Sequence, residues 1–324
     1  MFPEPISPML ATLITTDQFG AQEGWAFEMK WDGVRTVAYL ADGQVKLLSR
    51  KGRDDTAAYF EIAEALARLD VRSAILDGEV VVLDASGRPD FGLLQNRINL
   101  TRPADIQRLA QTFPAHLMLF DILELNGRSL VQQTYDERRA VLDQLTGLGP
   151  RIQLPPIFDG DLQAAQDTSR TLRLEGVVAK RRSSAYEPGR RSTNWRKIKE
   201  HPMQAVVIGG WRPGRGRRDG GIGSLLMAVP TEAGLHYVGR VGSGFNDRSL
   251  VELQQRLEGL AERECPMIDV PREDARDAHW VRPEVVGEVT YGELTGPGRM
   301  RHPVWRGLRP DLHAADVTWE LPAG

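Results

Sequence analysis

The chain of 324 residues contains a single cysteine, Cys265. One cysteine cannot form an internal disulfide, and its isolation also excludes the zinc sites that several cysteines build together. No apolar run approaches the roughly 20 positions that a helix needs to cross a bilayer. The N-terminal sequence MFPEPISPML lacks the basic start and apolar core of a signal peptide. We therefore expect a globular protein of the cytoplasm that does not associate with membranes.

The common phosphate-binding loops are also missing. No G-x-x-x-x-G-K-[ST] sequence occurs anywhere in the chain. The glycines of residues 239–245 depart from the G-x-G-x-x-G spacing, and no βαβ pattern follows them. Any nucleotide that the chain binds must therefore be held by other groups.

Basic residues are concentrated in one segment of an otherwise acidic chain. The formal net charge is −3, yet residues 180–218 carry twelve Lys or Arg residues against two acids, Glu187 and Glu200. A charge run is most often a solvated face. Here tryptophan and glycine interleave with the basic residues, in NWRKIK and GGWRPGRGRRDGG. We therefore expect one surface that contacts a polyanion, and nucleic acid fits best.

Strand-like runs separated by turn residues dominate the first half of the chain. Residues 34–40 and 44–50 flank an Asp-Gly pair, which predicts a β-hairpin. Residues 74–84 and 117–125 are short apolar runs, typical of buried strands. The pattern indicates a mixed α+β domain of sheets with flanking helices.

Helical spacing of apolar residues predicts three helices. One covers residues 56–69 behind a Thr56 cap, and a second opens at Asp136. In the third, Ser249 and Glu252 form the sequence pattern of a capping box.

The pattern of the sequence changes near residue 200. Three short, glycine-rich strand patterns follow, at residues 204–211, 223–230 and 235–245. Evenly spaced short strands with glycine turns are typical of a small barrel. We predict a first domain at residues 1–200 and a barrel domain at residues 201–324.

The stretch FEMKWDGVR, residues 27–35, places a lysine between two acids. In a strand its apolar and charged residues would point to opposite faces. Taken alone, this pattern fits an edge strand with a solvated charged face as well as it fits a reactive site. As a nucleophile, Lys30 would need its pKa lowered, because an ordinary lysine is neutral in only about one of 2,500 molecules at pH 7.

Further charged residues lie in separate short segments along the chain. The cations are Arg35, Arg50, Arg191, Lys197 and Lys199. Glu79 and Glu175 lie in or beside apolar strand patterns, where an unpaired charge is costly. Such acids need a partner, which could be a structural arginine or a hard cation.

The order of these segments resembles the order of the sequence motifs in the ATP-dependent DNA ligases. The matching segments are KWDGVR, SRKG, LDGEVVV, FDIL, EGVVAK, NWRKIK and WRGLRPD. Within that family the chain is most similar to the ligase domain of bacterial DNA ligase D, which acts in non-homologous end joining. The resemblance covers nearly the whole chain, and it implies a nucleotidyltransferase (adenylation) domain followed by an OB-fold.

The resemblance implies a chemical role for each matching residue. Lys30 would attack the α-phosphorus of ATP and form a lysyl-AMP. The residues placed at the nucleotide are Glu28 at the adenine amino group, Phe120 stacked on adenine and Glu79 at the ribose, and Arg35 and Arg50 would contact the nucleotide and later the nick phosphate. Lys180, Arg191, Lys197 and Lys199 match further nucleotide-site cations. Glu79 and Glu175 match metal-binding acids, and Mg²⁺ or Mn²⁺ is expected because several anions must coexist in one site.

Some of these residues have a structural alternative. Phe120 lies in so apolar a run that core packing would also account for it, and we assign Trp195 to packing. Asp32 and Asp121 fit either a catalytic or a structural role. At the C-terminal motif the family usually reads R-x-D-K, whereas this chain has Arg309 and then Leu312 in place of the lysine.

We expect an ATP-dependent DNA ligase that seals 5′-phosphate/3′-hydroxyl breaks in duplex DNA, as a monomer near the nucleoid. A Ku-type end-binding protein is the expected partner. NAD⁺ as the AMP donor is disfavoured, because relatives that use it carry a four-cysteine zinc module. An RNA ligase or a GTP-using capping enzyme shares the lysine motif. A nucleic-acid-binding protein with impaired catalysis is the alternative from another class, and Leu312 is its support.

Overall fold

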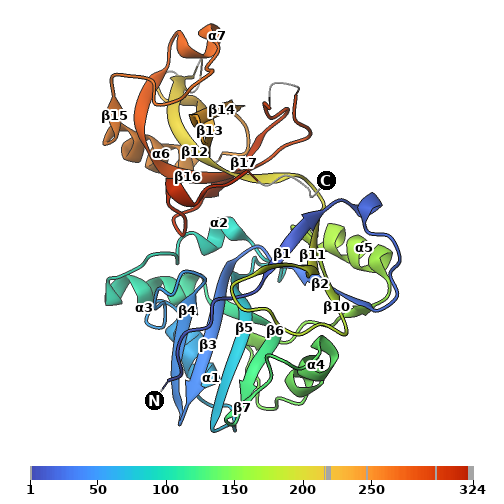
Figure 1. The fold of residues 1–324 in the computed structure, drawn as a ribbon. Coiled ribbons are helices and arrows are strands. Elements are labelled where there is room, and N and C mark those ends of the chain that lie inside the picture. The colour runs from blue at the N-terminus through green and yellow to red at the C-terminus, as the bar shows by residue number, and fades with distance from the viewer. Residues whose placement is uncertain (1, 215, 217–219, 246, 296–297, 320–324) are drawn as a thin grey trace. The chain divides into compact units, whose positions relative to one another are not determined.

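A computed structural model describes residues 2–214, 216, 220–245, 247–295 and 298–319 of the chain. The chain forms two compact units, Met1–Glu200 and His201–Leu321 (Figure 1). Each unit has hydrophobic cores of its own. No helix among the described residues combines the length and the apolar character that crossing a bilayer demands.

Two sheets form the framework of the first unit (Figure 1). The first sheet has the order β1-β11-β10-β2-β9, and the second has the order β4-β3-β5-β6-β7, with β8 paired to β6. The strands of the first sheet are β1 Leu10–Ile14, β2 Trp25–Lys30, β9 Phe158–Asp159, β10 Gly176–Arg181 and β11 Arg191–Lys199. The strands of the second are β3 Val34–Ala41, β4 Gln44–Ser49, β5 Ser73–Val82, β6 Ala115–Leu125, β7 Arg128–Ser129 and β8 Ile152–Gln153.

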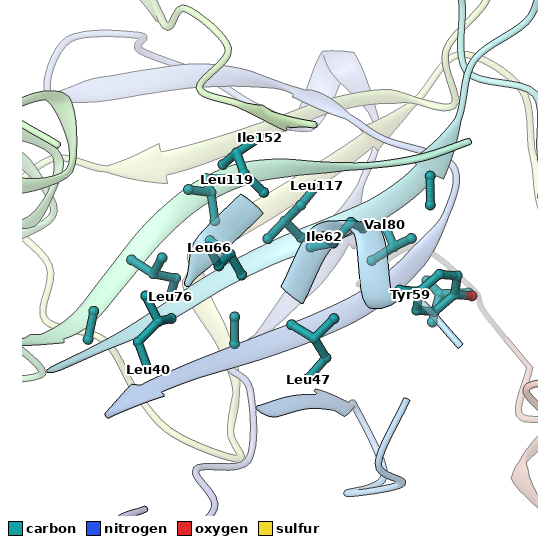
Figure 2. Close-up of a cluster of buried hydrophobic side chains, with 14 of the residues drawn as sticks. Leu40, Leu47, Tyr59, Ile62, Leu66, Leu76, Val80, Leu117, Leu119 and Ile152 are labelled. Carbon is teal, nitrogen blue, oxygen red and sulfur yellow. The ribbon is translucent and has the colours of Figure 1, made fainter. Parts of the chain in front are cut away.

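Helices cover the outer face of each sheet. They are α1 Phe60–Leu66, α2 Phe91–Leu94, α3 Pro103–Thr112, α4 Tyr135–Asp143 and α5 Leu162–Leu172. One core joins the second sheet to apolar side chains of α1, α2 and α4, and Figure 2 shows Ile62 and Leu66 of α1 against Leu76 and Leu117. A separate core joins α5 to the first sheet.

The inner faces of the two sheets share a third core. Val37 and Tyr39 of β3 contribute from the second sheet, and Trp195 of β11 contributes from the first. Alternate residues of β3, Ala38 and Leu40, belong instead to the core under α1, as the period of two in a strand requires. The space between the sheets thus contains apolar and aromatic side chains, and charged residues described below lie against them.

The predicted hairpin is confirmed. Strands β3 and β4 pair antiparallel from Thr36↔Ser49 to Ala41↔Gln44. Asp42 and Gly43 both have positive φ angles, of 50° and 75°, as a two-residue hairpin turn with a matching twist needs.

The predicted helix starts are wrong. α1 begins at Phe60, because the Thr56 hydroxyl accepts a hydrogen bond from the Leu47 amide (2.9 Å) instead of capping a helix. α4 begins at Tyr135, and its cap is Thr134, whose side chain accepts from the amide of Glu137.

The edge-strand interpretation of residues 27–35 is also wrong. β2 pairs with β10 on one side and with β9 on the other. Phe27 and Met29 pack in the core under α5, while Glu28, on the opposite face, is only 5% exposed. The charged row of this strand therefore faces protein, and its charges must be compensated there.

The second unit is a single curved sheet with one longer helix. The strand order is β14-β13-β12-β16-β15, and β17 pairs with β16. The elements are β12 Met203–Pro213, β13 Ile222–Thr231, β14 Gly234–Val241, α6 Asp247–Glu258, β15 Ala261–Glu262, α7 Arg272–Ala275, β16 His279–Thr290 and β17 Val304–Leu308. The Met300 and Trp305 amides donate to carbonyl oxygens of Val238 and Ser243, at 2.8 and 2.9 Å. These bonds join the last strand to β14 and close the barrel.

The predicted capping box of this unit is wrong, because α6 already begins at Asp247, two residues before Ser249. The apolar side of the helix is as expected. Leu250, Leu253 and Leu257 are buried in the core of the barrel.

A buried ion pair ties α4 to the second sheet. Arg138 donates to both oxygens of Asp121 on β6, at 2.7 and 2.9 Å, and neither side chain is more than 1% exposed. Asp121 therefore has a structural role. Removing one partner of such a pair leaves an uncompensated buried charge, which is strongly destabilising.

We predict that Arg138→Met lowers the free energy of unfolding by about 3–5 kcal/mol, measured by urea denaturation. Arg108→Met is the matched control, because Arg108 pairs with Asp105 on an exposed helix surface, where ion pairs contribute little. Equal effects of the two substitutions would contradict this account of the buried pair.

Candidate active site

The candidate site lies between the two sheets of the first unit. The first sheet contributes Glu28 and Lys30 from β2, Lys180 from β10, and Lys197 and Lys199 from β11. The second sheet contributes Arg35 from β3, Glu79 from β5 and Phe120 from β6. Residues from five of the predicted motifs therefore meet in one place.

Glu175 joins two lysines at the end of the first sheet. It precedes Gly176, which is opposite both Lys30 and Lys199 in the sheet register. The Lys30 Nζ forms a short hydrogen-bonded ion pair with Oε2 of Glu175, and the Lys199 Nζ lies 3.2 Å from Oε1. A Cβ at Gly176 would come within 2.0 Å of the Ile198 carbonyl oxygen, so only glycine permits this close approach.

The lysines hold Glu175 in its ionised form. Burial by itself raises the pKa of this carboxyl, but Lys30, Lys199 and Lys197 outweigh it and lower the pKa to about 2. The side chain is 9% exposed, so little water is available to replace these cations.

Glu79 has the opposite shift in pKa and therefore the opposite protonation state. Burial raises its pKa to about 8, against the opposing effect of Arg35 and Lys30, and the negative charges of Glu175 and Asp32 raise it further. Glu79 is opposite Arg35 in the register of β5 and β3. The site therefore holds one firmly ionised acid and one that is mostly protonated at neutral pH.

Arg35 is fixed against the ring of Phe120. Its Nε and one terminal nitrogen donate to the two oxygens of Asp77, at 2.6 and 2.7 Å. Asp77 is fully buried and also accepts a 2.6 Å hydrogen bond from the Tyr186 hydroxyl. The guanidinium carbon lies 4.5 Å from the centre of the Phe120 ring, within the range of a cation–π contact.

Glu28 is held at both carboxylate oxygens. The Tyr135 hydroxyl donates a short hydrogen bond to Oε1, and the Lys180 Nζ lies 2.9 Å from Oε2. Lys180 is 1% exposed and also donates to the Phe120 carbonyl oxygen at 2.9 Å. Its ammonium is therefore enclosed by protein and does not itself face an open site.

Two predicted residues of the first unit lie outside this cluster, and a third belongs to the second unit. Arg191 begins β11, about 20 Å along the strand from Lys197, and donates to the Ala11 carbonyl oxygen at 2.6 Å. Arg50 is exposed in the turn after β4. Arg309 belongs to the second unit, where it pairs with Asp311 at 2.7 Å and with Glu288 at 2.8 Å.

Several cations of the basic segment that the structure describes are enclosed or paired within the first unit. The basic segment spans both units. Lys180 and Lys199 are enclosed in the site, and Arg182 pairs with Asp136 and Asp159. The run of positive charge in the sequence therefore overstates the basic surface that is available to a polyanion.

The acids fit a metal that binds together with phosphates. Among the described residues, no three His, Cys, Asp or Glu side chains gather as a metal site. Glu79 and Glu175 are close enough for one charge to affect the other, and a divalent cation would relieve that repulsion. Mg²⁺ is commonly bound by one or two carboxylates together with substrate phosphates.

Three residues that shape the site are absent from the sequence-based prediction. Asp77, Tyr135 and Tyr186 fix Arg35 and Glu28, yet Tyr135 is 107 residues from Glu28 and Tyr186 is 109 residues from Asp77. Asp77 directly precedes the Gly-Glu pair of its motif, and its alternation with Glu79 along the strand was the one available signal.

Two family models match the chain. One, described as ATP dependent DNA ligase domain, covers residues 8–199, and the other, described as ATP dependent DNA ligase C terminal region, covers residues 218–312. The chain belongs to the ATP-dependent DNA ligase family. The match confirms the resemblance drawn from the motifs and the α+β fold class, an adenylation domain followed by an OB-fold.

Relatives within this family include multifunctional end-joining proteins. The chain is 44% identical over 319 residues to the multifunctional non-homologous end joining protein LigD of Mycolicibacterium smegmatis, covering 98% of this chain and 40% of that protein. LigD of Pseudomonas aeruginosa is 40% identical over 332 residues, with 99% and 37% covered. A structure of mycobacterial DNA ligase D complexed with ATP and MES is 41% identical, with a TM-score of 0.72 and 97% and 98% covered. This ligase chain spans less than half the length of these curated relatives.

The raised pKa of Glu79 predicts a pH-dependent effect on stability. Between its unfolded pKa near 4.5 and its folded pKa near 8, the folded chain keeps a proton that the unfolded chain loses, so stability falls as pH rises. Glu79→Gln removes this loss. We predict that the melting temperature of Glu79→Gln relative to wild type increases from about pH 5 to about pH 8 and then levels off.

Glu64→Gln, the same chemical change on an exposed position of α1, is the control for this experiment. Thermal unfolding at several pH values measures both differences. A difference between Glu79→Gln and wild type that does not vary with pH would contradict the assigned protonation state.

Proposed function

We propose that this chain is an ATP-dependent DNA ligase that seals 5′-phosphate/3′-hydroxyl breaks in duplex DNA through an AMP adduct on Lys30. The observation that carries the proposal is the meeting of Lys30 and Glu175, 145 residues apart, in a charged space between two sheets. Family membership supports the same chemistry.

Three steps follow. The Nζ of Lys30 forms a bond to the α-phosphorus of ATP while the α–β phosphoanhydride breaks and pyrophosphate leaves. The AMP then passes to a 5′-phosphate at the break, and the 3′-hydroxyl attacks that phosphate and releases AMP. Lys197 and Lys199 neutralise phosphate oxygens, which is the main contribution that a protein makes to phosphoryl transfer.

The ion pair with Glu175 holds Lys30 in a state that cannot react. An ammonium has no free electron pair, so Lys30 must lose its proton and separate from Glu175 before it attacks. Mg²⁺ or Mn²⁺ held by Glu175 and Glu79 would neutralise these acids and the phosphates of ATP. The amine would then face the nucleotide without its counter-ion.

The geometry of the first unit supports an assignment of the adenine and phosphate contacts. Glu28 lies where a base edge can be recognised, and Phe120 presents a ring for stacking. Arg35 is held in place by Asp77 for contact with the nucleotide. Arg50 and Arg191 lie at exposed positions and are assigned to phosphates of the nucleotide or DNA.

The second unit supplies one cation of the C-terminal motif. Arg309 is oriented by Asp311 and Glu288. Leu312 stands where the family usually has lysine, and it packs against the core of the barrel. We propose that Arg309 alone performs the role that the family divides between two cations during departure of pyrophosphate.

The LigD relatives are named for non-homologous end joining, and we propose that pathway for this chain. The work would take place on chromosomal DNA in the cytoplasm, with the ligase acting as a monomer and a Ku-type protein presenting the broken ends. Contacts to phosphates predict DNA binding that is largely independent of sequence and weakened by salt.

We predict that Lys30→Ala and Lys30→Arg both reduce sealing of a nicked duplex by at least about a thousandfold. Arginine can keep the ion pair with Glu175 but remains protonated, so it cannot attack phosphorus. Both variants should still seal nicks that already carry AMP on the 5′-phosphate. Lys46→Ala, at a lysine on β4, should behave as wild type, and ATP-driven sealing by Lys30→Arg at the wild-type rate would contradict the proposal.

Labelled nucleotides separate ligation from capping chemistry. The proposal predicts that wild type is labelled by α-labelled ATP, in an adduct that acid releases. Labelling by GTP alone would contradict it and favour a capping-type transferase. A DNA nick and an RNA nick compared at equal concentration test the preference for DNA.

A further inference from the structure

The carboxylate of Glu28 binds two donors that are far from it in the sequence of the first unit. Tyr135 is the first residue of α4, and Lys180 lies on β10. All three side chains are buried, with exposures of 5% for Glu28 and 1% for each of its partners. Each partner occupies a different oxygen of the carboxylate.

This arrangement fixes what the remaining lone pairs of Glu28 can bind. An ionised carboxylate only accepts hydrogen bonds, and its two oxygens offer about four acceptor positions. Burial and the nearby Glu28 charge raise the pKa of Tyr135 well above its usual range, so the phenol remains a donor. With two positions filled by donors, the free positions point in a fixed direction and require a donor from the ligand.

The same ammonium also anchors the residue assigned to the base's face. Lys180 donates to the Phe120 carbonyl oxygen at 2.9 Å, and it lies 4.7 Å from the centre of that residue's ring. Lys180 therefore connects Glu28, which would bind the edge of the base, to β6, which carries the Phe120 ring.

We propose that Tyr135 and Lys180 are positioning residues that make the first step selective for ATP over GTP. At the position where adenine has an amino group, guanine has a carbonyl oxygen, and two acceptors facing each other repel. A carboxylate that is held in one orientation cannot turn away from the wrong base. This inference rests on the proposed role of Glu28 at the base, and it adds two residues that do not themselves touch the nucleotide.

Tyr135→Phe is the sharpest test, because it removes the hydroxyl while Lys180 still compensates the charge of Glu28. We expect the KM for ATP in Lys30 adenylation to rise about tenfold, because a hydrogen bond to a charged group is lost, with little change in the limiting rate. The preference for ATP over GTP should fall by a similar factor. Sealing of nicks that already carry AMP should be unchanged.

Tyr237→Phe is the matched control. Tyr237 is also 1% exposed, and its hydroxyl donates to a buried carboxylate, Asp274, at 2.8 Å in the second unit. This control should leave the ratio of ATP to GTP labelling unchanged. A double variant with Glu28→Gln distinguishes positioning from packing, because Tyr135→Phe should have no further effect on the ratio once Glu28 has lost its charge.

The outcomes separate this inference from the proposed function. If wild type forms no AMP adduct at all, the proposed function fails. If wild type is labelled and Tyr135→Phe keeps both its KM for ATP and its ATP preference, the positioning role is overturned. The positioning role would also be overturned if Tyr135→Phe lowered the ATP-to-GTP labelling ratio by the same factor in wild type and in the Glu28→Gln variant. The hydroxyl would then act independently of Glu28.

Discussion

A carboxylate that is buried between two sheets needs a cation beside it, and the site of this ligase is organised around that constraint. Glu175 is compensated by Lys30 and Lys199, Glu28 by Lys180, and Asp77 by Arg35. The pairs of Lys30 with Glu175 and of Lys180 with Glu28 join segments far apart in sequence, so they position the proposed catalytic groups as well as neutralising them. Glu79, whose pKa is raised to about 8, is the exception, because it neighbours other acids and its cations are shared.

The pairing also explains how a nucleotide and a metal would change the site. In the structure, Lys30 is the counter-ion of Glu175, so the amine that we propose as the nucleophile is occupied. Under the proposed function, the charges of ATP and of a divalent cation held by Glu79 and Glu175 would take the place of these internal partners. Glu28 and Phe120, to which we assign the base in our proposal, are anchored by buried partners and need no such exchange.

Local patterns in the sequence predicted the elements and the chemical groups, but not their partners. Glu79 and Glu175 stand out because each lies in or beside an apolar strand pattern, Lys30 because it lies between two acids, and the hairpin because Asp-Gly suits its turn. The helix start at Thr56 failed because a tertiary bond to Leu47 takes its hydroxyl. The hydrogen bond from Tyr135 to Glu28 depends on how the two sheets and α4 pack. No local sequence pattern predicts that packing. The sequence also does not reveal which lysines of the basic segment are buried, as Lys180 and Lys199 are.

The central claim is that the Lys30 amine attacks the innermost phosphorus of ATP. Mass spectrometry tests it most directly, on the intact chain and on its proteolytic peptides after incubation with ATP and Mg²⁺. The account predicts a chain heavier by one AMP, with the added mass on the peptide that contains Lys30. An unmodified chain, or an adduct on any other residue, would contradict it.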